Sequence, residues 1–267
     1  MNNEFRQGFF TSSQASRLIN YESRAMTADE KAAHKKEFPS SKKQNISIDG
    51  FGASGHTYIE EVCLEREIGR VLQTEVKTRP IKWGSLMEVV LFNLLGMGYQ
   101  MCHKQTKKHP KHGKFWSGTP DLIVPNVKIG EIKCYEPKKF TKLSKCLLKK
   151  DIQLFRENFK DEYWQCVSNA SICGVTKAEM IAYMPYKKEL EILIEQIEET
   201  NFLERNGLDP ADYYFMTRSD IETLPYLPNE SKFSNINTFE FEIPEDIDDF
   251  IDEEEENILD KRLFTRK

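Results

Sequence analysis

The amino-acid sequence predicts an α/β fold, and three observations support this prediction. Apolar residues recur at helical spacing over residues 54–72 and 84–97. Two short apolar segments within residues 121–134 are separated by a turn signal and predict a β-hairpin. Helical patterns over residues 144–173 then lead into a further strand, 178–184. Helices and strands thus follow one another along the chain, which is typical of an α/β fold.

The first part of the chain is expected to be mostly helical. Residues 9–20 open with Thr and Ser residues that can act as N-caps before a short helical pattern. Residues 27–48 are polar and rich in Lys and Ser, which predicts a loop or a frayed helix. The two longer apolar patterns, 54–72 and 84–97, predict regular helices.

The middle of the chain changes to strand patterns after Gly98. Residues 99–116 are polar and predict one or two strands with the basic loop HKQTKKHPKHGK. The apolar run DLIVP ends at Pro125 and Asn126, a turn signal, and VKIGEIKC follows with partial alternation. We therefore expect a β-hairpin with its turn near Asn126.

The second half returns to helices. Residues 144–160 and 161–173 predict two helices, and AEMIAYM (178–184) predicts a strand that ends at Pro185. A charged amphipathic helix is expected over residues 187–204.

The domain organisation follows from length and composition. A chain of 267 residues suits one large domain with appendages. We expect a domain over residues 1–224, with its core at about 54–190, and an acidic C-terminal tail over residues 225–267. Prolines and then an acidic run in this tail cannot bury enough apolar surface to fold alone. We expect it to be partly disordered or docked on the domain.

The composition is that of a soluble globular protein, with 39% hydrophobic and 30% charged residues. No apolar run approaches the roughly 18 residues of a membrane span, and the N-terminus does not resemble a secretory signal. We expect a cytoplasmic protein that does not enter a membrane. The six cysteines are scattered without a C-x-x-C pair, so we expect free thiols instead of a zinc or iron–sulfur site.

The net charge of −5 hides a strong asymmetry. Residues 240–256 contain eleven acidic residues and no basic one. The stretch from Lys77 to Lys150 contains sixteen Lys or Arg residues against four acids. A basic stretch inside a globular body indicates a polyanionic partner such as nucleic acid, although a solvated lysine-rich surface gives the same pattern.

The predicted hairpin can bring two carboxylates together. Asp121 and Glu131 lie five residues before and after Asn126, so an antiparallel ladder centred there places them opposite each other. Facing Cβ atoms in such a ladder are about 4.5–5.5 Å apart. Two carboxylates this close repel each other unless a cation or a proton lies between them.

A strand also places Glu131 and Lys133 on one face, because its side chains alternate, while the Ile132 carbonyl can reach an ion beside Glu131. Phosphodiester hydrolysis needs a hard divalent cation held by such oxygens and a positive group near the attacking water. The hairpin therefore predicts a metal-dependent phosphodiesterase site.

Two further residues have alternative interpretations. Ser85 and Glu88 have the spacing of a helix capping box, which from spacing alone is the preferred interpretation of Glu88. Gln165 is, on its own, a polar residue on a helix face.

These segments resemble the PD-(D/E)XK nuclease superfamily, and in particular the YqaJ-like viral recombinase group that includes phage lambda exonuclease. The resemblance spans roughly residues 9–190. The matching segments, in chain order, are Thr11-Ser12-Ser13 through Leu18, Trp83-Gly84 with Glu88, Ser117-Gly118-Thr119-Pro120-Asp121, Gly130-Glu131-Ile132-Lys133-Cys134, and Tyr163-Trp164-Gln165 followed by Tyr183-Met184-Pro185.

The resemblance implies a restriction-endonuclease-like core with a central mixed β-sheet flanked by helices. It implies that Glu88, Asp121, Glu131 and the Ile132 carbonyl bind Mg²⁺, for which Mn²⁺ can substitute. Lys133 would position or activate the attacking water, and Gln165 would orient the substrate or the water.

The resemblance also implies contacts with DNA. Ser13 and Arg17 are the nearest matches to the family's contacts with a terminal phosphate. The basic loop before the SGTPD segment adds four lysines as candidate DNA contacts: Lys104, Lys107, Lys108 and Lys111.

The leading hypothesis is an exonuclease that degrades linear double-stranded DNA from its ends in phage-type recombination or repair. Relatives in this group include trimers, and a single-strand annealing protein is a candidate partner. A restriction-like or repair endonuclease with the same core is an alternative, and so is a non-catalytic DNA-binding module that has kept the fold.

Overall fold

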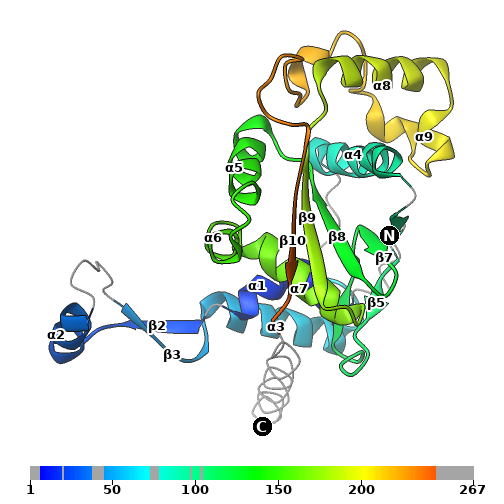
Figure 1. The fold of residues 1–267 in the computed structure, drawn as a ribbon. Helices are drawn as coiled ribbons and strands as arrows, with labels where there is room; N and C mark the ends of the chain where they lie inside the picture. The colour runs from blue at the N-terminus through cyan, green and yellow to red at the C-terminus, as the bar shows by residue number, and fades with distance from the viewer. Residues whose placement is uncertain are drawn as a thin grey trace.

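A five-stranded mixed β-sheet forms the centre of the computed structural model, which describes residues 7–19, 21–37, 45–72, 78–96, 98–102 and 105–244 (Figure 1). The strand order is β10-β9-β8-β7-β4; β8 and β9 are parallel, and the other neighbours are antiparallel. The strands are β4 (Gln100–Met101), β7 (Leu122–Val124), β8 (Lys128–Lys133), β9 (Lys177–Tyr183) and β10 (Ile236–Glu242).

The predicted hairpin and its register are confirmed. Strand β7 pairs with β8 so that Leu122 faces Gly130 and Val124 faces Lys128. The turn is centred at Asn126, whose φ of 60° lies in the left-handed region that Asn tolerates better than most residues. One step further along this register, Asp121 comes opposite Glu131.

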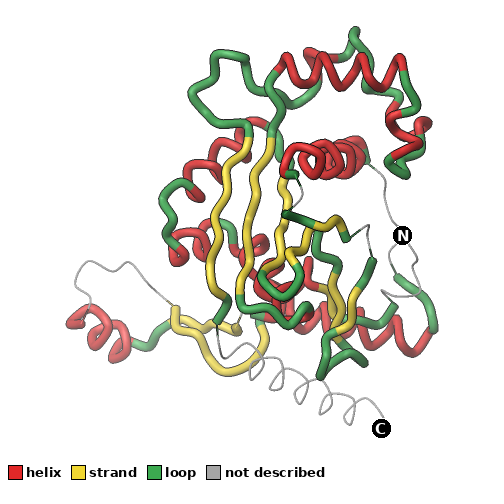
Figure 2. Tube along the Cα trace, turned by 45° about the vertical axis from the view of Figure 1, so that its right-hand side comes forward, coloured by secondary structure: helices red, strands yellow, loops and turns green. Residues whose placement is uncertain are grey.

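Helices cover both faces of the sheet, as Figures 1 and 2 show. On one face, β9 contributes Met180 to a core formed with α3, α5, α6 and α7. On the other face, the adjacent Ile181 packs into a second core with α4 and α8. The helices are α3 (Ala53–Ile68), α4 (Arg79–Leu95), α5 (Pro137–Leu147), α6 (Ile152–Asn158), α7 (Lys160–Ile172), α8 (Lys187–Glu199) and α9 (Phe202–Arg205). The expected α/β fold with a central mixed sheet flanked by helices is confirmed.

The boundaries of three predicted helices are wrong. The helix expected over residues 187–204 is divided, because α8 ends at Glu199 and α9 follows it. Helix α4 begins at Arg79 instead of residue 84, with Thr78 as its N-cap residue and Pro80 in its first turn. The predicted helix 144–160 is divided between α5 and α6. The helical conformation is interrupted at Lys150, whose φ is 52°. The Asp151 side chain then caps α6 by accepting a hydrogen bond from the Leu154 amide.

The N-terminal segment combines a strand with short helical turns. Strand β1 (Phe10–Thr11) pairs in parallel with β6 (Trp116–Gly118), and β5 (Lys107–Lys108) pairs with β6 on its other side. A 3₁₀ turn, η2 (Ser12–Gln14), and α1 (Ala15–Leu18) follow β1. The short helix expected in residues 9–20 is thus present, and β1 fixes its start beside β6.

An arm projects from the body of the protein, on the left of Figure 1. It consists of the antiparallel strands β2 (Tyr21–Ala25) and β3 (Asn45–Phe51) with α2 (Ala28–Glu37) between them. The helical alternative for residues 27–48 is therefore correct for α2, whereas the two strands were not predicted.

Strand β10 lies within the segment that the sequence analysis placed in an acidic tail. It pairs with β9 along its full length, from Ile236 opposite Tyr183 to Glu242 opposite Lys177. Phe239 and Phe241 are buried in the core. This strand completes the central sheet, so the part of the expected tail that contains β10 packs on the domain. Residues 245–267, which include most of the acidic run, lie outside the described residues.

The described helices include none with the combined length and apolarity that a membrane crossing requires. The six cysteines are all free thiols, and Cys102, Cys146 and Cys166 are buried.

The burial of β10 predicts a large effect of Phe241→Ala on stability. The Phe241 ring stacks on Tyr163 with centroids 5.6 Å apart, so truncation leaves a cavity and should lower the free energy of unfolding by about 3–5 kcal/mol. Chemical denaturation measures this loss. The control Glu242→Ala removes an exposed side chain on the same strand, and should change stability by no more than about 0.5 kcal/mol. Equal effects of the two substitutions would show that β10 is not part of the folded core.

Candidate active site

Asp121 and Glu131 meet at the end of the β7–β8 hairpin. Glu131 is fully buried in β8, and Asp121 is half-buried immediately before β7. The main-chain amide of Ile132 donates a hydrogen bond of 2.8 Å to Asp121 Oδ2. This bond fixes the Asp121 carboxylate against the strand that carries Glu131. The facing arrangement predicted from the turn therefore places both acids at one site.

Helix α7 supplies the other partners of Glu131. Asn169 Nδ2 donates to one oxygen of the Glu131 carboxylate, and Gln165 Nε2 donates to the other at 2.9 Å. Gln165 Oε1 in turn accepts a hydrogen bond of 2.8 Å from Lys133 Nζ. Gln165 thus bridges the two charged residues that share one face of β8.

Sequence analysis did not identify Asn169. Its only signal was its spacing, because residues four apart lie on one face of a helix and Asn169 is four residues after Gln165. Its Oδ1 atom is buried and has no hydrogen-bond partner among the described residues. Its amide group therefore serves chiefly to donate to the carboxylate.

The charged groups of the site shift one another's pKa values. Burial raises the pKa of Glu131 well above its usual value, and the nearby Asp121 carboxylate raises it further, whereas Lys133 and Asn169 oppose the rise. Burial lowers the pKa of Lys133, but Glu131 and Asp121 outweigh this effect and raise it. Lys133 therefore stays protonated at neutral pH, and the raised pKa of Glu131 reflects its burial beside Asp121, which favours a shared proton or a cation between the two carboxylates.

A hard divalent cation fits this arrangement. Two carboxylates held together in a buried site repel each other, and a cation between them would relieve that repulsion. Asp121 and Glu131 offer carboxylate oxygens and Ile132 a carbonyl oxygen, which are the donors that Mg²⁺ prefers. The described Asp, Glu, His and Cys residues form no cluster of three or more that could hold a metal ion. Glu88 does not cluster with the other two acids in this structure, and its role as a metal ligand stays a prediction from the resemblance.

The capping interpretation of Glu88 is wrong. Because α4 begins at Arg79, Glu88 lies in the helix interior, where it is half-buried. The pKa of Cys134, which directly follows β8, is raised by burial and then by the charges of Glu88 and Asp121. Glu88 thus faces the end of β8 at which the site lies.

The SGTPD segment packs closely against α7. A Cβ atom at Gly118 would lie 2.1 Å from Asn169 Oδ1 and 2.2 Å from Ser12 Oγ. Ser12 Oγ is 2.9 Å from Ser168 Oγ, which also accepts a hydrogen bond of 2.8 Å from Trp116 Nε1. Glycine at this position therefore lets strand β6, the N-terminal segment and the Glu131-binding helix lie against one another.

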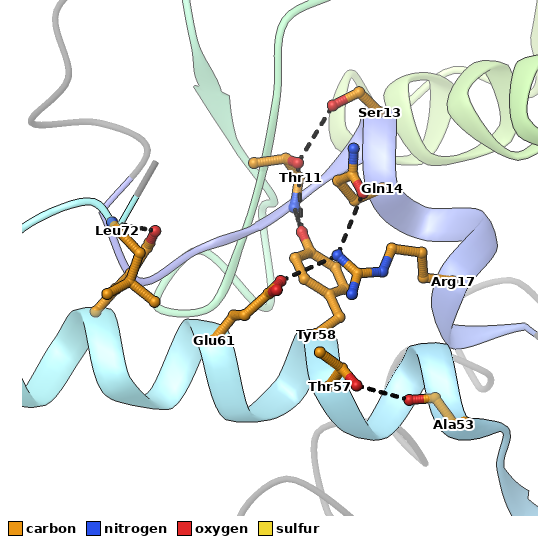
Figure 3. Close-up of polar contacts among 10 residues, drawn as sticks. Thr11, Ser13, Gln14, Arg17, Ala53, Thr57, Tyr58, Glu61 and Leu72 are labelled. Carbon is orange, nitrogen blue, oxygen red and sulfur yellow. Dashed lines mark hydrogen bonds and ion pairs between the residues drawn. The ribbon is translucent and has the colours of Figure 1, made fainter. Parts of the chain in front are cut away.

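The N-terminal candidates Ser13 and Arg17 lie beside this junction, and Figure 3 shows their contacts. Ser13 is exposed, with its hydroxyl 3.3 Å from Thr11 Oγ1. Arg17 donates to Glu61 Oε2 at 3.0 Å and lies over the Tyr58 ring at 4.7 Å. Helix α3, which carries Glu61 and Tyr58, thus orients the Arg17 guanidinium.

The basic loop lies next to the SGTPD strand. Lys107 and Lys108 form β5, with Lys107 opposite Gly118 and Lys108 opposite Ser117. Lys108 and Lys111 are exposed, and Lys107 is half-buried. Lys104 lies outside the described residues.

Comparison with known proteins gives fold similarity without sequence similarity. No known family model matches the chain, and no curated protein sequence matches it.

Three solved structures are similar to this chain over nearly its whole length. LHK-Exo in complex with dAMP has a TM-score of 0.54 and 13% identity, covering 97% of this chain and 90% of that one. The alkaline exonuclease LHK-Exo from Laribacter hongkongensis has a TM-score of 0.53 and 14% identity, covering 98% of this chain and 92% of that one. A phage related exonuclease from Haemophilus somnus 129PT has a TM-score of 0.49 and 14% identity, covering 94% of this chain and 90% of that one. The exonuclease-like fold expected from the sequence is confirmed.

The packing around Gly118 predicts opposite effects of two glycine substitutions. Gly118→Ala should destabilise the protein by about 1–3 kcal/mol, because the added methyl group overlaps Asn169 and Ser12. Gly84→Ala is the matched control. A Cβ atom there meets nothing within 4 Å inside α4, so this change should leave stability unchanged or raise it by up to about 1 kcal/mol. Thermal or chemical denaturation compares the two variants, and a Gly118→Ala protein as stable as the wild type would contradict the close packing.

Proposed function

We propose that this protein is a divalent-metal-dependent DNA nuclease that degrades linear double-stranded DNA from its ends. The observation that carries the proposal is the contact of two carboxylates, Asp121 and Glu131, with a protonated lysine beside them. Similarity to the alkaline exonuclease fold supports it, and one of those neighbours was crystallised with the nucleotide dAMP.

The metal ligands we assign are Asp121, Glu131 and the Ile132 carbonyl. A bound Mg²⁺ or Mn²⁺ would polarise the scissile phosphate and lower the pKa of a water. The hydrogen bond from the Ile132 amide orients the Asp121 carboxylate, and Asn169 and Gln165 hold that of Glu131. We assign Glu88 a role beside this set, where its charge attracts cations to the end of β8.

Lys133 has an electrostatic role in the proposed reaction. A protonated lysine cannot remove a proton from water, but it can stabilise the negative charge that develops on the attacking oxygen and the phosphate. Gln165 holds the Lys133 ammonium group next to Glu131. The lysine is thus placed before substrate binds, so little reorganisation is needed during reaction.

The DNA contacts we assign lie on two neighbouring segments. Ser13 and Arg17 are candidates for a terminal phosphate, because Ser12 connects their segment to α7 one residue before Asn169. Lys107, Lys108 and Lys111 add positive charge beside the SGTPD strand. Lys104 stays a prediction from the charge of the basic loop. Trimer formation and an annealing partner stay predictions from the resemblance.

An endonuclease with the same core is the second candidate function, since the cleavage chemistry is shared. The exonuclease assignment rests on the fold neighbours and on the proposed terminal-phosphate contacts. The non-catalytic alternative is disfavoured because Asp121, Glu131, Lys133 and Gln165 retain contacts that suit catalysis.

Digestion of matched DNA substrates tests the proposal. With Mg²⁺ or Mn²⁺, the wild type should degrade linear duplex DNA and leave covalently closed circles intact. Asp121→Asn should lower the rate at least about a thousandfold, because the metal contributes several kcal/mol of charge stabilisation.

The control is Glu199→Gln, which neutralises an exposed carboxylate on α8 and should retain wild-type activity. Cleavage of closed circles would favour the endonuclease. Equal digestion by wild type and Asp121→Asn would refute the assigned site.

A further inference from the structure

Helix α5 carries a row of lysines that the proposed chemistry does not use. Lys138, Lys142, Lys145 and Lys149 follow one another at intervals of four, three and four residues, which places them along one side of the helix and its final turn. All four are exposed. We call this set the α5 lysine face.

The opposite side of α5 is buried in the core. Phe140, Leu143 and Leu147 are completely buried there. A basic amphipathic helix can bind a membrane surface when its apolar side is free. Here that side is packed under the protein, which leaves the charged side as the available surface.

The lysine face has few partners within the protein. Among the described residues, no hydrogen bond or ion pair reaches the side chains of Lys138, Lys142 or Lys149, whereas the neighbouring Lys139 side chain pairs with Glu162 at 2.9 Å. Lys145 lies over the Phe233 ring at 5.8 Å. Like charges four residues apart on a helix repel each other, and an anionic partner would offset this repulsion.

A groove runs beside the lysine face. One wall is formed by residues of and around α5: Glu136, Lys138, Lys139, Lys142, Lys145, Cys146 and Lys149. The other wall is formed by residues of α6, α7 and the link between them: Leu154, Glu157, Asn158, Phe159, Lys160, Asp161 and Glu162. The second wall is acidic overall, because Glu157, Asp161 and Glu162 outnumber its one lysine, Lys160. An anionic chain in this groove would therefore follow the α5 side.

One end of the groove lies next to the candidate active site. Glu162, which lines the groove, accepts a hydrogen bond from Tyr135, two residues after Lys133. Its charge also contributes to the raised pKa of Lys133. Glu162 lies one helical turn before Gln165 on α7. The lysine face thus begins beside the catalytic groups and leads away from them.

We propose that the α5 lysine face binds the phosphate backbone of the DNA strand that leads to or from the active site; this inference rests on the proposed nuclease function. From Lys138 to Lys149 the helix rises about 16 Å, at about 1.5 Å per residue. One strand of B-DNA carries a phosphate every 3.4 Å or so of axis, so the face spans about five phosphates. Lysine contacts to phosphates carry no sequence information, and the binding is therefore independent of sequence.

A binding experiment with matched charge variants tests this inference. The test variant is Lys138→Gln, Lys142→Gln and Lys149→Gln combined. The control combines Lys188→Gln, Arg205→Gln and Arg218→Gln, which removes three exposed positive charges from α8 and the segment after it. Both sets are placed in the Asp121→Asn background, and the affinity for a labelled duplex is measured without divalent metal over a range of salt concentrations.

The test variant should bind at least about tenfold more weakly near 0.1 M salt than the background protein. Its salt slope should fall by about 3, because each of the three substituted lysines would no longer neutralise a phosphate. The control should keep the slope and affinity of the background protein. Coincident curves for the test variant and the control would overturn the inference.

The outcome is separable from that of the proposed function, because binding is measured without cleavage. If the wild type does not digest DNA but the test variant loses affinity, the nuclease assignment fails and the lysine face remains a DNA-binding surface. If the wild type digests DNA and the test variant binds like the control, the inference about α5 alone is wrong.

Discussion

Two carboxylates in contact inside the protein impose the main constraint on this structure. The β7–β8 register brings Asp121 to Glu131, and Glu131 is fully buried. Placing a charge away from water is costly unless partners compensate for the lost hydration. The neighbouring groups provide this compensation: the Ile132 amide binds Asp121, the Asn169 and Gln165 amides bind Glu131, and the Lys133 ammonium lies alongside.

Helix α7 connects this site with the rest of the molecule. Its Glu162 accepts a hydrogen bond from Tyr135, and its Gln165 and Asn169 donate to Glu131. Its Ser168 contacts Ser12 of the N-terminal segment. The proposed end-contacting residues, the catalytic groups and the start of the α5 groove are therefore held by one rigid element. A shift of α7 would disturb all three. A side chain at Gly118 of β6 would push against Asn169 on α7, so glycine at this position keeps the helix in place.

The sequence predicted correctly those features that depend on residues close together along the chain. The hairpin register followed from a turn centred at Asn126, and once this turn is fixed, antiparallel pairing brings Asp121 opposite Glu131. The first turn of α4 was missed because Thr78 and Pro80 lie before the apolar pattern on which the prediction relied. Asn169 and strand β10 were missed for a different reason. Both are defined by partners distant in sequence, Glu131 and β9. The spacing of Asn169 from Gln165 and the alternation of Phe239 and Phe241 with acidic residues are local signals too weak to identify those partners.

The direct test of the carboxylate pair is the position of a bound metal ion. Crystals prepared with Mn²⁺ should show an anomalous scattering peak within bonding distance of carboxylate oxygens from both Asp121 and Glu131, in agreement with the hard oxygen donors gathered there. Asp121→Asn crystals should lose the peak while the hairpin keeps its register. A Mn²⁺ ion bound elsewhere, with Asp121 and Glu131 still in contact and sharing a proton, would contradict the account.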